Sequence, residues 1–507
     1  MAYQISSKGK VTVALIIIAI VLVALYQFKV IPHSIFTSAQ KPDAIITANN
    51  WVGYLGLLAA NGGLEPDTNS IFYQKFGILV KIIWQDNPQA AHDAWKAGEV
   101  DGLWQTLDAF TTEVSGLMEF KPIIPLIVDR SNGGDLCIAR PGINSVDDLV
   151  KRKEDGSLNK VALAVNAPSH TLFLRMMQAG GKQPSEVELV GKTDAIAAKQ
   201  DFLNGNVDAA VIWSPDDEEC IKAVPGSKVI FSTEKATNII YDIFLFKKSF
   251  AEKKEKVLKA FVEGVLYGNA LVNTDPLAKE RAIQIMSVCF NTDINFIKAV
   301  ADKARRSTYG DNVNFFLNPN FKGMTGERLY RESGLLFAQV GAAPATLPDW
   351  KQIVWTKTLQ SITDLTGPQQ MAEAAPAFTP ITKEIASAPA IAIKKVTVNF
   401  AINSALLTAE ARGIIDREFV TIARANAAYR IRVEGNTDNT GSDKINIPLS
   451  YRRAQSVVNH LIETYNFDPR RFVVVGNGST NPLPGNKNAT PEERLANRRT
   501  EFQLLPQ

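Results

Sequence analysis

The chain has 507 residues, of which 46% are hydrophobic and 21% are charged, and its formal net charge at pH 7 is +3. This length exceeds what one hydrophobic core usually serves, so we expect two or three globular domains. The near balance of charge gives no broad basic surface, and the aromatic residues are not interleaved with Lys and Arg. We therefore expect no nucleic-acid partner.

Cysteine and histidine are too few and too scattered to indicate a metal or catalytic site. The three cysteines, Cys137, Cys220 and Cys289, form neither a disulfide framework nor a zinc-binding pattern. The sequence contains no nucleophile elbow, no P-loop, no Gly-x-Gly-x-x-Gly after a strand and no HExxH helix. We predict that the protein is not an enzyme and has no catalytic residues, no metal and no cofactor.

The N-terminal segment is strongly apolar. Lys8 and Lys10 precede an apolar run at residues 11–26, which Phe28 and Val30 extend. A basic flank followed by such a run is typical of a short membrane-spanning helix with a cytoplasmic N-terminus. A cleavable signal peptide is the competing interpretation, but no small-x-small site follows the run closely. We predict an uncleaved transmembrane anchor in residues 1–30, set in a bacterial inner membrane, with the rest of the chain in the periplasm.

From residue 43 onward, strand patterns alternate with helix patterns. Strands are predicted at residues 44–48, 78–84, 100–104, 160–165 and 207–213. Helices are predicted at residues 53–60, 90–97, from Ser169 onward, and at 252–273, 277–289 and 294–306. This βαβ rhythm predicts parallel sheets covered by helices, and the length of the region indicates two lobes.

Ligands of such folds bind beyond the C-terminal ends of the strands, where this chain has many aromatic and small polar residues. The candidate ligand-binding residues are Trp51, Tyr54, Gln105, Thr106, Ser169, His170, Thr171, Trp213, Asp216 and Asp242. Helix capping explains Ser169 equally well, and core packing is the alternative for the tryptophans.

Five aspartates lie in or near the same loops: Asp108, Asp129, Asp135, Asp216 and Asp242. If several of them face inward, a cationic or zwitterionic ligand is expected.

Four short motifs in this region carry a family resemblance. They are WVGY at Trp51, AGEVDGLWQT at Ala97, SNGGD at Ser131 and GNVDAAVIWSPD at Gly205. Together they resemble the periplasmic solute-binding proteins of ABC importers, in the nitrate, sulfonate, taurine and thiamine-precursor class, over about residues 43–310. The resemblance implies a two-lobed solute-binding domain, placed at 43–340. Many relatives have Trp-Glu-Pro where this chain has Trp213-Ser214-Pro215, so the ligand need not be theirs.

A change of composition follows the solute-binding region. Residues 342–348 and 372–380 are rich in Ala and Pro, which is typical of semi-rigid spacers. Between them, residues 350–365 have helical spacing. We place a spacer with a helical segment at residues 341–391.

A polar turn near the C-terminus suggests a second binding site. A predicted strand at residues 429–434 ends in a Gly/Asn/Thr/Asp turn, and a helix is expected to open near Pro448. Asp438 then lies at the end of the strand and Arg453 within the helix. A carboxylate and a guanidinium in these positions suit a zwitterion, because one binds an ammonium group and the other a carboxylate. A structural salt bridge explains the spacing equally well.

The wider pattern decides between these alternatives. TDxxGsxxxNxxLSxxRAxxV from Thr437, followed by Gly476-Asn-Gly478 and Asn497-Arg498-Arg499, resembles the OmpA-like peptidoglycan-binding domain over about residues 392–507. The resemblance implies a βαβαβ sandwich in which Asp438 and Arg453 bind the free end of diaminopimelate in the wall peptide, supported by Thr437 and Asn446. It also implies a fold-stabilising ion pair for Arg499. Strands at 396–400, 472–475 and 500–505 and a helix at 406–423 fit this fold.

These features together predict a solute-binding protein that is anchored in the inner membrane and attached to peptidoglycan, with an ABC permease or an envelope signalling protein as its partner. The alternative is a non-transporting structural linker between the inner membrane and the cell wall. A flagellar-stator-like channel subunit has a similar layout, but it would need a carboxylate in its membrane helix. Residues 11–28 contain none.

Overall fold

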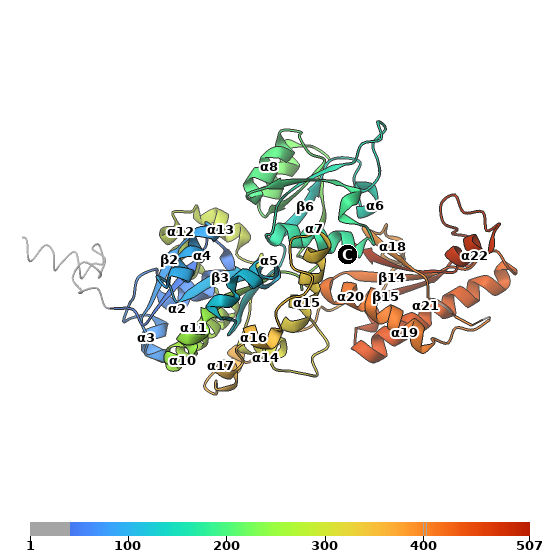
Figure 1. Ribbon diagram of the computed structural model, residues 1–507. Helices are drawn as coiled ribbons and strands as arrows, with labels where there is room; N and C mark the ends of the chain where they lie inside the picture. The colour runs from blue at the N-terminus through green and yellow to red at the C-terminus, as the bar shows by residue number, and fades with distance from the viewer. Residues whose placement is uncertain (1–40, 399, 402, 507) are drawn as a thin grey trace, which may run out of the picture.

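The computed structural model describes residues 41–398, 400–401 and 403–506. These residues form two lobes and a C-terminal domain, which lie side by side in Figure 1. The predicted membrane helix in residues 1–30 lies outside this part of the chain. Within the described residues, no helix combines the length and the apolar character needed to cross a membrane.

Lobe 1 is built on a seven-stranded mixed sheet. Its strands are β1 (Ala44–Ala48), β2 (Val80–Trp84), β3 (Gly102–Thr106), β4 (Pro122–Ile123), β5 (Ile127–Ser131), β11 (Tyr241–Lys247) and β12 (Ala304–Arg306). The order is β12-β5-β11-β3-β1-β2, with β4 beside β11. β1 pairs in parallel with β2 and β3, whereas β11 is antiparallel to β3, β4 and β5. The sheet is therefore not the purely parallel one predicted, because β11 re-enters lobe 1 from lobe 2 in the opposite direction.

Helices cover both faces of this sheet. They are η2 (Val52–Tyr54), α2 (Leu55–Asn61), α3 (Ile71–Phe76), α4 (Pro88–Ala97), α5 (Leu107–Leu117), η3 (Met118–Phe120), α10 (Lys248–Lys253), α11 (Glu255–Thr274), α12 (Pro276–Phe290), α13 (Ile294–Val300), α14 (Tyr309–Phe316) and α15 (Gly326–Gln339). The helix predicted at 294–306 is wrong in its second half. It ends at Val300, and Ala304–Arg306 forms β12 by pairing with β5.

Lobe 2 repeats the plan with a five-stranded sheet of order β10-β6-β9-β7-β8. Its elements are β6 (Asp135–Ala139), α6 (Val146–Leu149), β7 (Lys160–Ala164), α7 (Pro168–Ala179), η4 (Pro184–Glu186), β8 (Glu188–Lys192), α8 (Ala195–Leu203), β9 (Ala209–Trp213), α9 (Asp216–Ala223) and β10 (Lys228–Ser232). The predicted two-lobed α/β fold is thus confirmed.

The two lobes are joined by residues 132–134 and 233–240, which we call the crossing segments. The two crossing segments lie close together, because the hydroxyl of Thr233, at the start of the second, is 2.7 Å from that of Ser131, which precedes the first. Away from the crossing segments, α7 of lobe 2 lies against α5 and α15 of lobe 1. The Thr171 hydroxyl donates to Asp108 Oδ2 at 2.6 Å across this contact. The lobes therefore touch at this helix contact as well as at the crossing segments.

The C-terminal domain has a four-stranded sheet of order β13-β16-β14-β15. Its elements are β13 (Ala392–Val396), α19 (Ala409–Ile415), the π-helical turn η6 (Asp416–Val420), α20 (Thr421–Ala425), β14 (Arg430–Gly435), α21 (Asp443–Tyr465), η7 (Pro469–Arg471), β15 (Phe472–Gly476), α22 (Pro491–Asn497) and β16 (Thr500–Leu505). Two predicted boundaries are wrong. The first strand is 392–396 instead of 396–400, and α21 begins at Asp443, so that Pro448 lies inside it. Pro448 is the sixth residue of α21, so it lacks the N–H that would donate to the Lys444 carbonyl, and the helix continues past it with one hydrogen bond fewer.

The C-terminal domain docks on lobe 2, and one continuous hydrophobic core runs through both. The rings of Phe231 and Tyr429 stack at 5.8 Å, and the Val146 N–H donates to the Ile391 carbonyl at 2.9 Å. Along the chain, the C-terminal domain is joined to the helices of lobe 1 by the spacer. Its helices are α16 (Trp350–Ile353), α17 (Lys357–Gln360), η5 (Gly367–Gln369) and α18 (Lys383–Ser387). Trp350 and Leu359 are buried against lobe 1.

One buried guanidinium ties the helical layer of the C-terminal domain to the start of β15. Arg471 is fully buried and donates to the main-chain carbonyls of Tyr429, Ala423 and Asn426 at 2.9, 2.8 and 2.6 Å. Burial lowers the pKa of Arg471 to about 9.

We expect Arg471→Met to lower the free energy of unfolding by several kcal/mol, because three buried carbonyls would lose their donors at roughly 1–3 kcal/mol each. The neighbouring Arg470→Met is the control, since the Arg470 side chain is exposed and its guanidinium bonds only to Asp468 within the described structure. Urea unfolding of both variants measures the difference. Equal stabilities would contradict this role of Arg471.

Candidate functional site

Four carboxylates lie together where lobe 1 faces lobe 2, and we call them the acidic cluster: Asp108, Asp129, Asp135 and Asp242. Strand pairing explains their proximity. On β11, Asp242 lies directly opposite Asp129 of β5 and Thr106 of β3. Asp108 lies in the first turn of α5 just after β3, and Asp135 begins β6 after the first crossing segment. Lobe 1 thus contributes three of the carboxylates and lobe 2 contributes one.

All four carboxylates of the acidic cluster are buried, and none is more than 7% exposed. Positive charge nearby is scarce. Arg306 lies opposite Asp129 on β12, but its guanidinium bonds to the carbonyls of Val52 and Ala301 and to Asn273. Arg130 forms a close ion pair with Glu373 instead. Buried charges without counter-charges are costly, so the cluster favours protonated carboxyls in this state of the protein.

The pKa values shift as this burial requires. Burial raises the pKa of Asp108 to about 7 against the lowering effect of the Thr171 hydroxyl, and raises that of Asp135 to about 6. Burial, followed by repulsion from Asp129 and Asp108, raises the pKa of Asp242 well above its usual value. Burial also raises the pKa of Asp129, although Trp51 and Arg306 oppose the shift.

Aromatic side chains flank the acidic cluster in both lobes. The Trp51 indole N–H donates to Asp129 Oδ1 at 3.0 Å. Trp213 lies directly opposite Asp135 on the neighbouring strand and is 40% exposed. Gly53 makes room for the Asp129 carboxylate, because a Cβ at this position would lie 2.0 Å from its Oδ2 atom.

The structure brings six of the ten predicted ligand residues to the acidic cluster. Asp242 belongs to it, Trp51, Thr171 and Trp213 contact or adjoin its carboxylates, and the hydroxyls of Tyr54 and Thr106 lie beside Asp242 and Asp108. The other four have different surroundings, as follows.

Gln105 bonds to Glu113 and to the His92 ring, on the opposite side of β3 from Thr106. Asp216 pairs with Lys199 at 2.9 Å within lobe 2. The His170 ring packs edge-on against Phe337, and burial lowers its pKa to about 4. Ser169 is fully buried at the start of α7.

The second predicted site lies at the far end of the C-terminal domain. Asp438 follows β14, and its carboxylate accepts from the Thr440 N–H at 2.8 Å and from Arg498 Nη1 at 2.7 Å. Burial raises the pKa of Asp438, but these hydrogen bonds and the charge of Arg498 outweigh it, so the pKa lies below its usual value. Thr437 and Asn446 shape the turn, since both donate to the Asp438 carbonyl.

Arg453 does not form an ion pair with Asp438. It donates to the carbonyls of Ser404 and Ala401 and its guanidinium lies 5.0 Å from the centre of the Phe400 ring. Arg453 and Arg498 line the same small hollow, of about 40 Å³, and the charge of Arg498 contributes to lowering the pKa of Arg453 after burial. Two guanidinium groups facing one hollow can bind an anionic group, here next to the carboxylate of Asp438.

The sequence missed Arg498, although it stands in the Asn497-Arg498-Arg499 motif, because spacing does not show which of two adjacent arginines faces the turn. Arg499 forms the ion pair implied by the resemblance, with Glu501 at 2.6 Å and both side chains buried. Adjacent side chains point in opposite directions here, so Arg498 reaches Asp438 in the turn and Arg499 is buried in the core.

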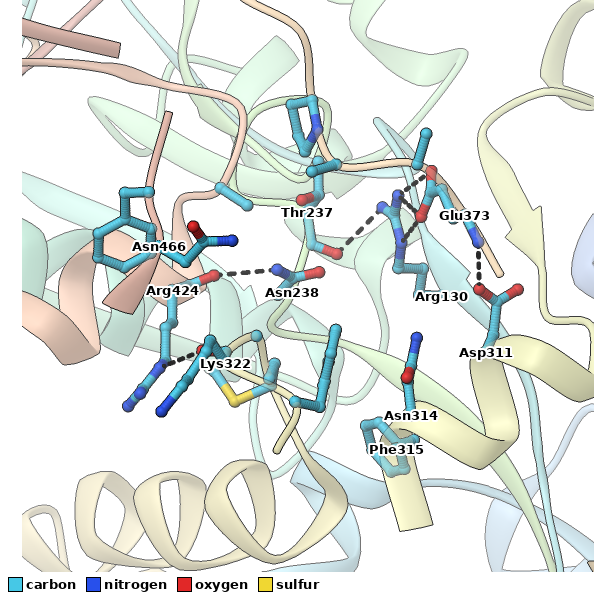
Figure 2. A pocket seen from close by; sticks show the side chains of 18 of the residues that line it. Arg130, Thr237, Asn238, Asp311, Asn314, Phe315, Lys322, Glu373, Arg424 and Asn466 are labelled. Carbon is cyan, nitrogen blue, oxygen red and sulfur yellow. Dashed lines mark hydrogen bonds and ion pairs between the residues drawn. The ribbon is translucent and has the colours of Figure 1, made fainter. Parts of the chain in front are cut away.

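A larger cavity, of about 450 Å³, lies between the second crossing segment, the spacer and the C-terminal domain. Figure 2 shows Glu373 of the spacer reaching Arg130, which also donates to the Thr237 carbonyl at 3.1 Å. On the other side, Asn238 donates to the Arg424 carbonyl at 3.0 Å. The crossing segment therefore contacts both the spacer and the C-terminal domain. No sequence pattern predicted this cavity, because its residues come from separate segments.

Comparisons with known proteins match the two-lobed part of the chain and the C-terminal domain to two different families. Residues 67–287 match the model of the NMT1-like family, and residues 399–498 match that of the OmpA family. We call the part of the chain that contains the first match the NMT1-like domain and the part that contains the second the OmpA-family domain. Both predicted resemblances are confirmed. Within the described residues, no group of three or more His, Cys, Asp and Glu side chains is arranged to hold a metal ion.

The OmpA-family domain is 35% identical over 130 residues to outer membrane protein A of Bordetella avium, which is 25% of this chain and 65% of that protein. It is 47% identical over 73 residues to the peptidoglycan-binding protein ArfA of Mycobacterium tuberculosis, which is 14% of this chain and 22% of that protein. The chain thus spans less than two thirds of these relatives.

The two lobes are similar to the solved periplasmic aliphatic sulphonate-binding protein SsuA from Escherichia coli, at 16% identity and a TM-score of 0.49, over 64% of this chain and 100% of that one. They are also similar to the periplasmic nitrate-binding protein NrtA from Synechocystis, at 13% identity and a TM-score of 0.44. This similarity covers 63% of this chain and 89% of that one.

The raised pKa values of the acidic cluster predict an unusual pH dependence of stability. In the unfolded chain an aspartate has a pKa of about 3.9, so the folded protein holds extra protons between about pH 4 and pH 7, and its stability falls as the pH rises through this range. Asp242→Asn removes one such group. We expect the melting temperature of this variant, relative to the wild type, to increase from pH 5 to pH 8.

Asp201→Asn is the matched control, because its hydrogen bond from Lys192 lowers the pKa of Asp201 and keeps it ionised at both pH values. Its difference from the wild type should be the same at pH 5 and pH 8. A pH-independent difference for Asp242→Asn as well would show that Asp242 is an ordinary ionised aspartate.

Proposed function

We propose that this protein binds a small solute between its two lobes and attaches to peptidoglycan through its OmpA-family domain. The observation that carries the proposal is the joining, in one chain, of a two-lobed domain with polar groups buried between its lobes and a wall-type domain with Asp438, Arg453 and Arg498 at one end. The acidic cluster and its flanking aromatic residues form the proposed solute site.

Solute entry requires the lobes to open, because the acidic cluster is buried in the present arrangement. The crossing segments are the natural hinge, since only they join the two sheets along the chain, and hinge closure around a ligand is a common motion of two-lobed proteins. The occupied form would then serve an ABC permease or an envelope signalling protein.

At the wall-binding site, the zwitterionic end of diaminopimelate fits the order of charges. Its carboxylate would lie in the hollow between Arg453 and Arg498, and its ammonium group would bind Asp438. The lowered pKa of Asp438 keeps this carboxylate ionised for that purpose at neutral pH.

The apolar run at residues 11–26 supports an anchor in the inner membrane for the N-terminal end of the chain. The protein would then connect that membrane to the wall. The core shared by lobe 2 and the OmpA-family domain also suits the second candidate function, a rigid linker without a solute.

For the wall-binding site, we expect Asp438→Ala and Arg453→Ala to weaken co-sedimentation with purified diaminopimelate-type peptidoglycan at least about tenfold, because each loses a charge-assisted hydrogen bond. Asp468→Ala is the control, since its exposed pair with Arg470 lies in the same domain but away from the turn. Circular dichroism checks the fold. Unchanged sedimentation of both folded variants would refute the site.

For the solute site, native mass spectrometry of the purified full chain should reveal a bound small molecule. Trp213→Ala should retain less of it, because that substitution removes an aromatic wall beside Asp135. Trp84→Ala is the matched control, as Trp84 is similarly exposed, at 38%, but packs on Phe290. A chain that never carries or binds a small molecule would favour the rigid linker.

A further inference from the structure

We propose that the solute is an organic cation with ammonium or guanidinium groups, held by the acidic cluster. This inference rests on the proposed function and names the chemistry of its ligand.

The charge of the site is strongly unbalanced. Asp129 and Asp242 lie directly opposite each other on paired strands, where like charges destabilise a sheet. Asp108 and Asp135 also act on Asp242 electrostatically, so each of the other three carboxylates of the acidic cluster repels Asp242. Two guanidinium groups act on Asp129, and both have other partners: Arg306 bonds to main-chain carbonyls and an amide and lies 3.9 Å from the Asp302 carboxylate, and Arg130 pairs with Glu373. A bound cation would supply the missing counter-charge.

Unused acceptors point into the same place. Asp108 Oδ1, Asp129 Oδ2 and Asp135 Oδ1 are buried and make no hydrogen bond within the described structure. Buried polar atoms are rarely left unpaired, so three unpaired carboxylate oxygens from three elements indicate a missing donor. Ammonium and guanidinium groups carry several N–H donors and no acceptor, as these oxygens require.

Neutral hydroxyls provide an observation independent of the acids. Tyr54 and Thr106 are more than nine-tenths buried, and their hydroxyls form no hydrogen bond of normal geometry in the part of the chain described here. Those of Tyr54 and Thr106 lie beside Asp242 and Asp108. A hydroxyl beside a carboxylate can accept a further N–H from the same ligand.

Aromatic rings complete the site. Trp51 bonds to Asp129 in lobe 1, and Trp213 adjoins Asp135 in lobe 2. Tryptophan faces attract organic cations and cover the methylene groups between charges. A metal ion fits less well, because no three His, Cys, Asp or Glu side chains among the described residues have metal-ligand geometry.

Proton release should accompany binding. The groups facing Asp242 and Asp129 are Tyr54, Asp108, Asp135, Arg130 and Arg306, and burial dominates the raised pKa values of the carboxyls. A cation favours the ionised carboxylates, so its binding expels protons and becomes tighter from pH 5 to pH 8.

The test is isothermal titration calorimetry of the ligand-freed full chain with 1,4-diaminobutane, spermidine and agmatine, and with ethanesulfonate, nitrate and Ca²⁺ as other classes. We expect at least one organic cation to bind, at least about tenfold more tightly at pH 8 than at pH 5, with proton release seen as a dependence of the heat on the buffer. Asp242→Asn should weaken that binding at least about tenfold, whereas Asp201→Asn should not change it.

The amide variant should fold, because it mimics the protonated carboxyl of the ligand-free state, and its melting curve checks this. Binding of an anion or Ca²⁺ but of no organic cation would overturn the inference and leave the solute-binding function intact. So would cation binding that Asp242→Asn leaves unchanged. If no probe binds, the inference is overturned, and native mass spectrometry of the freshly purified chain decides separately on solute binding.

Discussion

The burial of four carboxylates between two lobes is the constraint on which the rest of the NMT1-like domain depends. Antiparallel pairing of β11 with β5 and β3 places Asp242 beside Asp129 and Thr106, and the first crossing segment brings Asp135 to them from lobe 2. Hydrogen bonds to Trp51 and Thr171 satisfy part of the cluster only. The remaining repulsion opposes closure of the lobes unless the carboxyls hold protons or a counter-charge. Closure is therefore linked to what the cleft contains.

Closure of the lobes would also affect the OmpA-family domain, because that domain is attached to both lobes. Lobe 2 shares its hydrophobic core with that domain. The spacer, in contrast, packs α16 and α17 on lobe 1, and its Glu373 forms an ion pair with Arg130, the residue after Asp129. The second crossing segment touches both sides through Thr237 and Asn238. A rotation of the lobes must therefore change either the docking of the OmpA-family domain or the path of the spacer. Under the proposed function, a solute that closes the lobes would therefore also act on the domain that attaches to the wall.

Much of this arrangement was predictable from sequence. Apolar periodicity located most strands, and local motifs located Asp438, Arg453 and the cleft residues Trp51, Thr106, Thr171 and Asp242. Long-range pairing was not predictable. The antiparallel return of β11 and the pairing of β12 depend on strands far away in the chain, and Gln105 and Asp216 turn to partners that no local pattern identifies. The choice of Arg498 over Arg453 as the partner of Asp438, and the docking of the C-terminal domain on lobe 2, likewise arise from tertiary contacts.

Infrared difference spectroscopy tests the central claim most directly, because the carbonyl stretch of a protonated carboxyl is distinct from that of a carboxylate. The ligand-free protein at neutral pH should show a buried protonated-carboxyl band that Asp242→Asn reduces, and saturation with the organic cation that binds should abolish it. A ligand-free protein without such a band, or a band that persists in the saturated complex, would contradict the account.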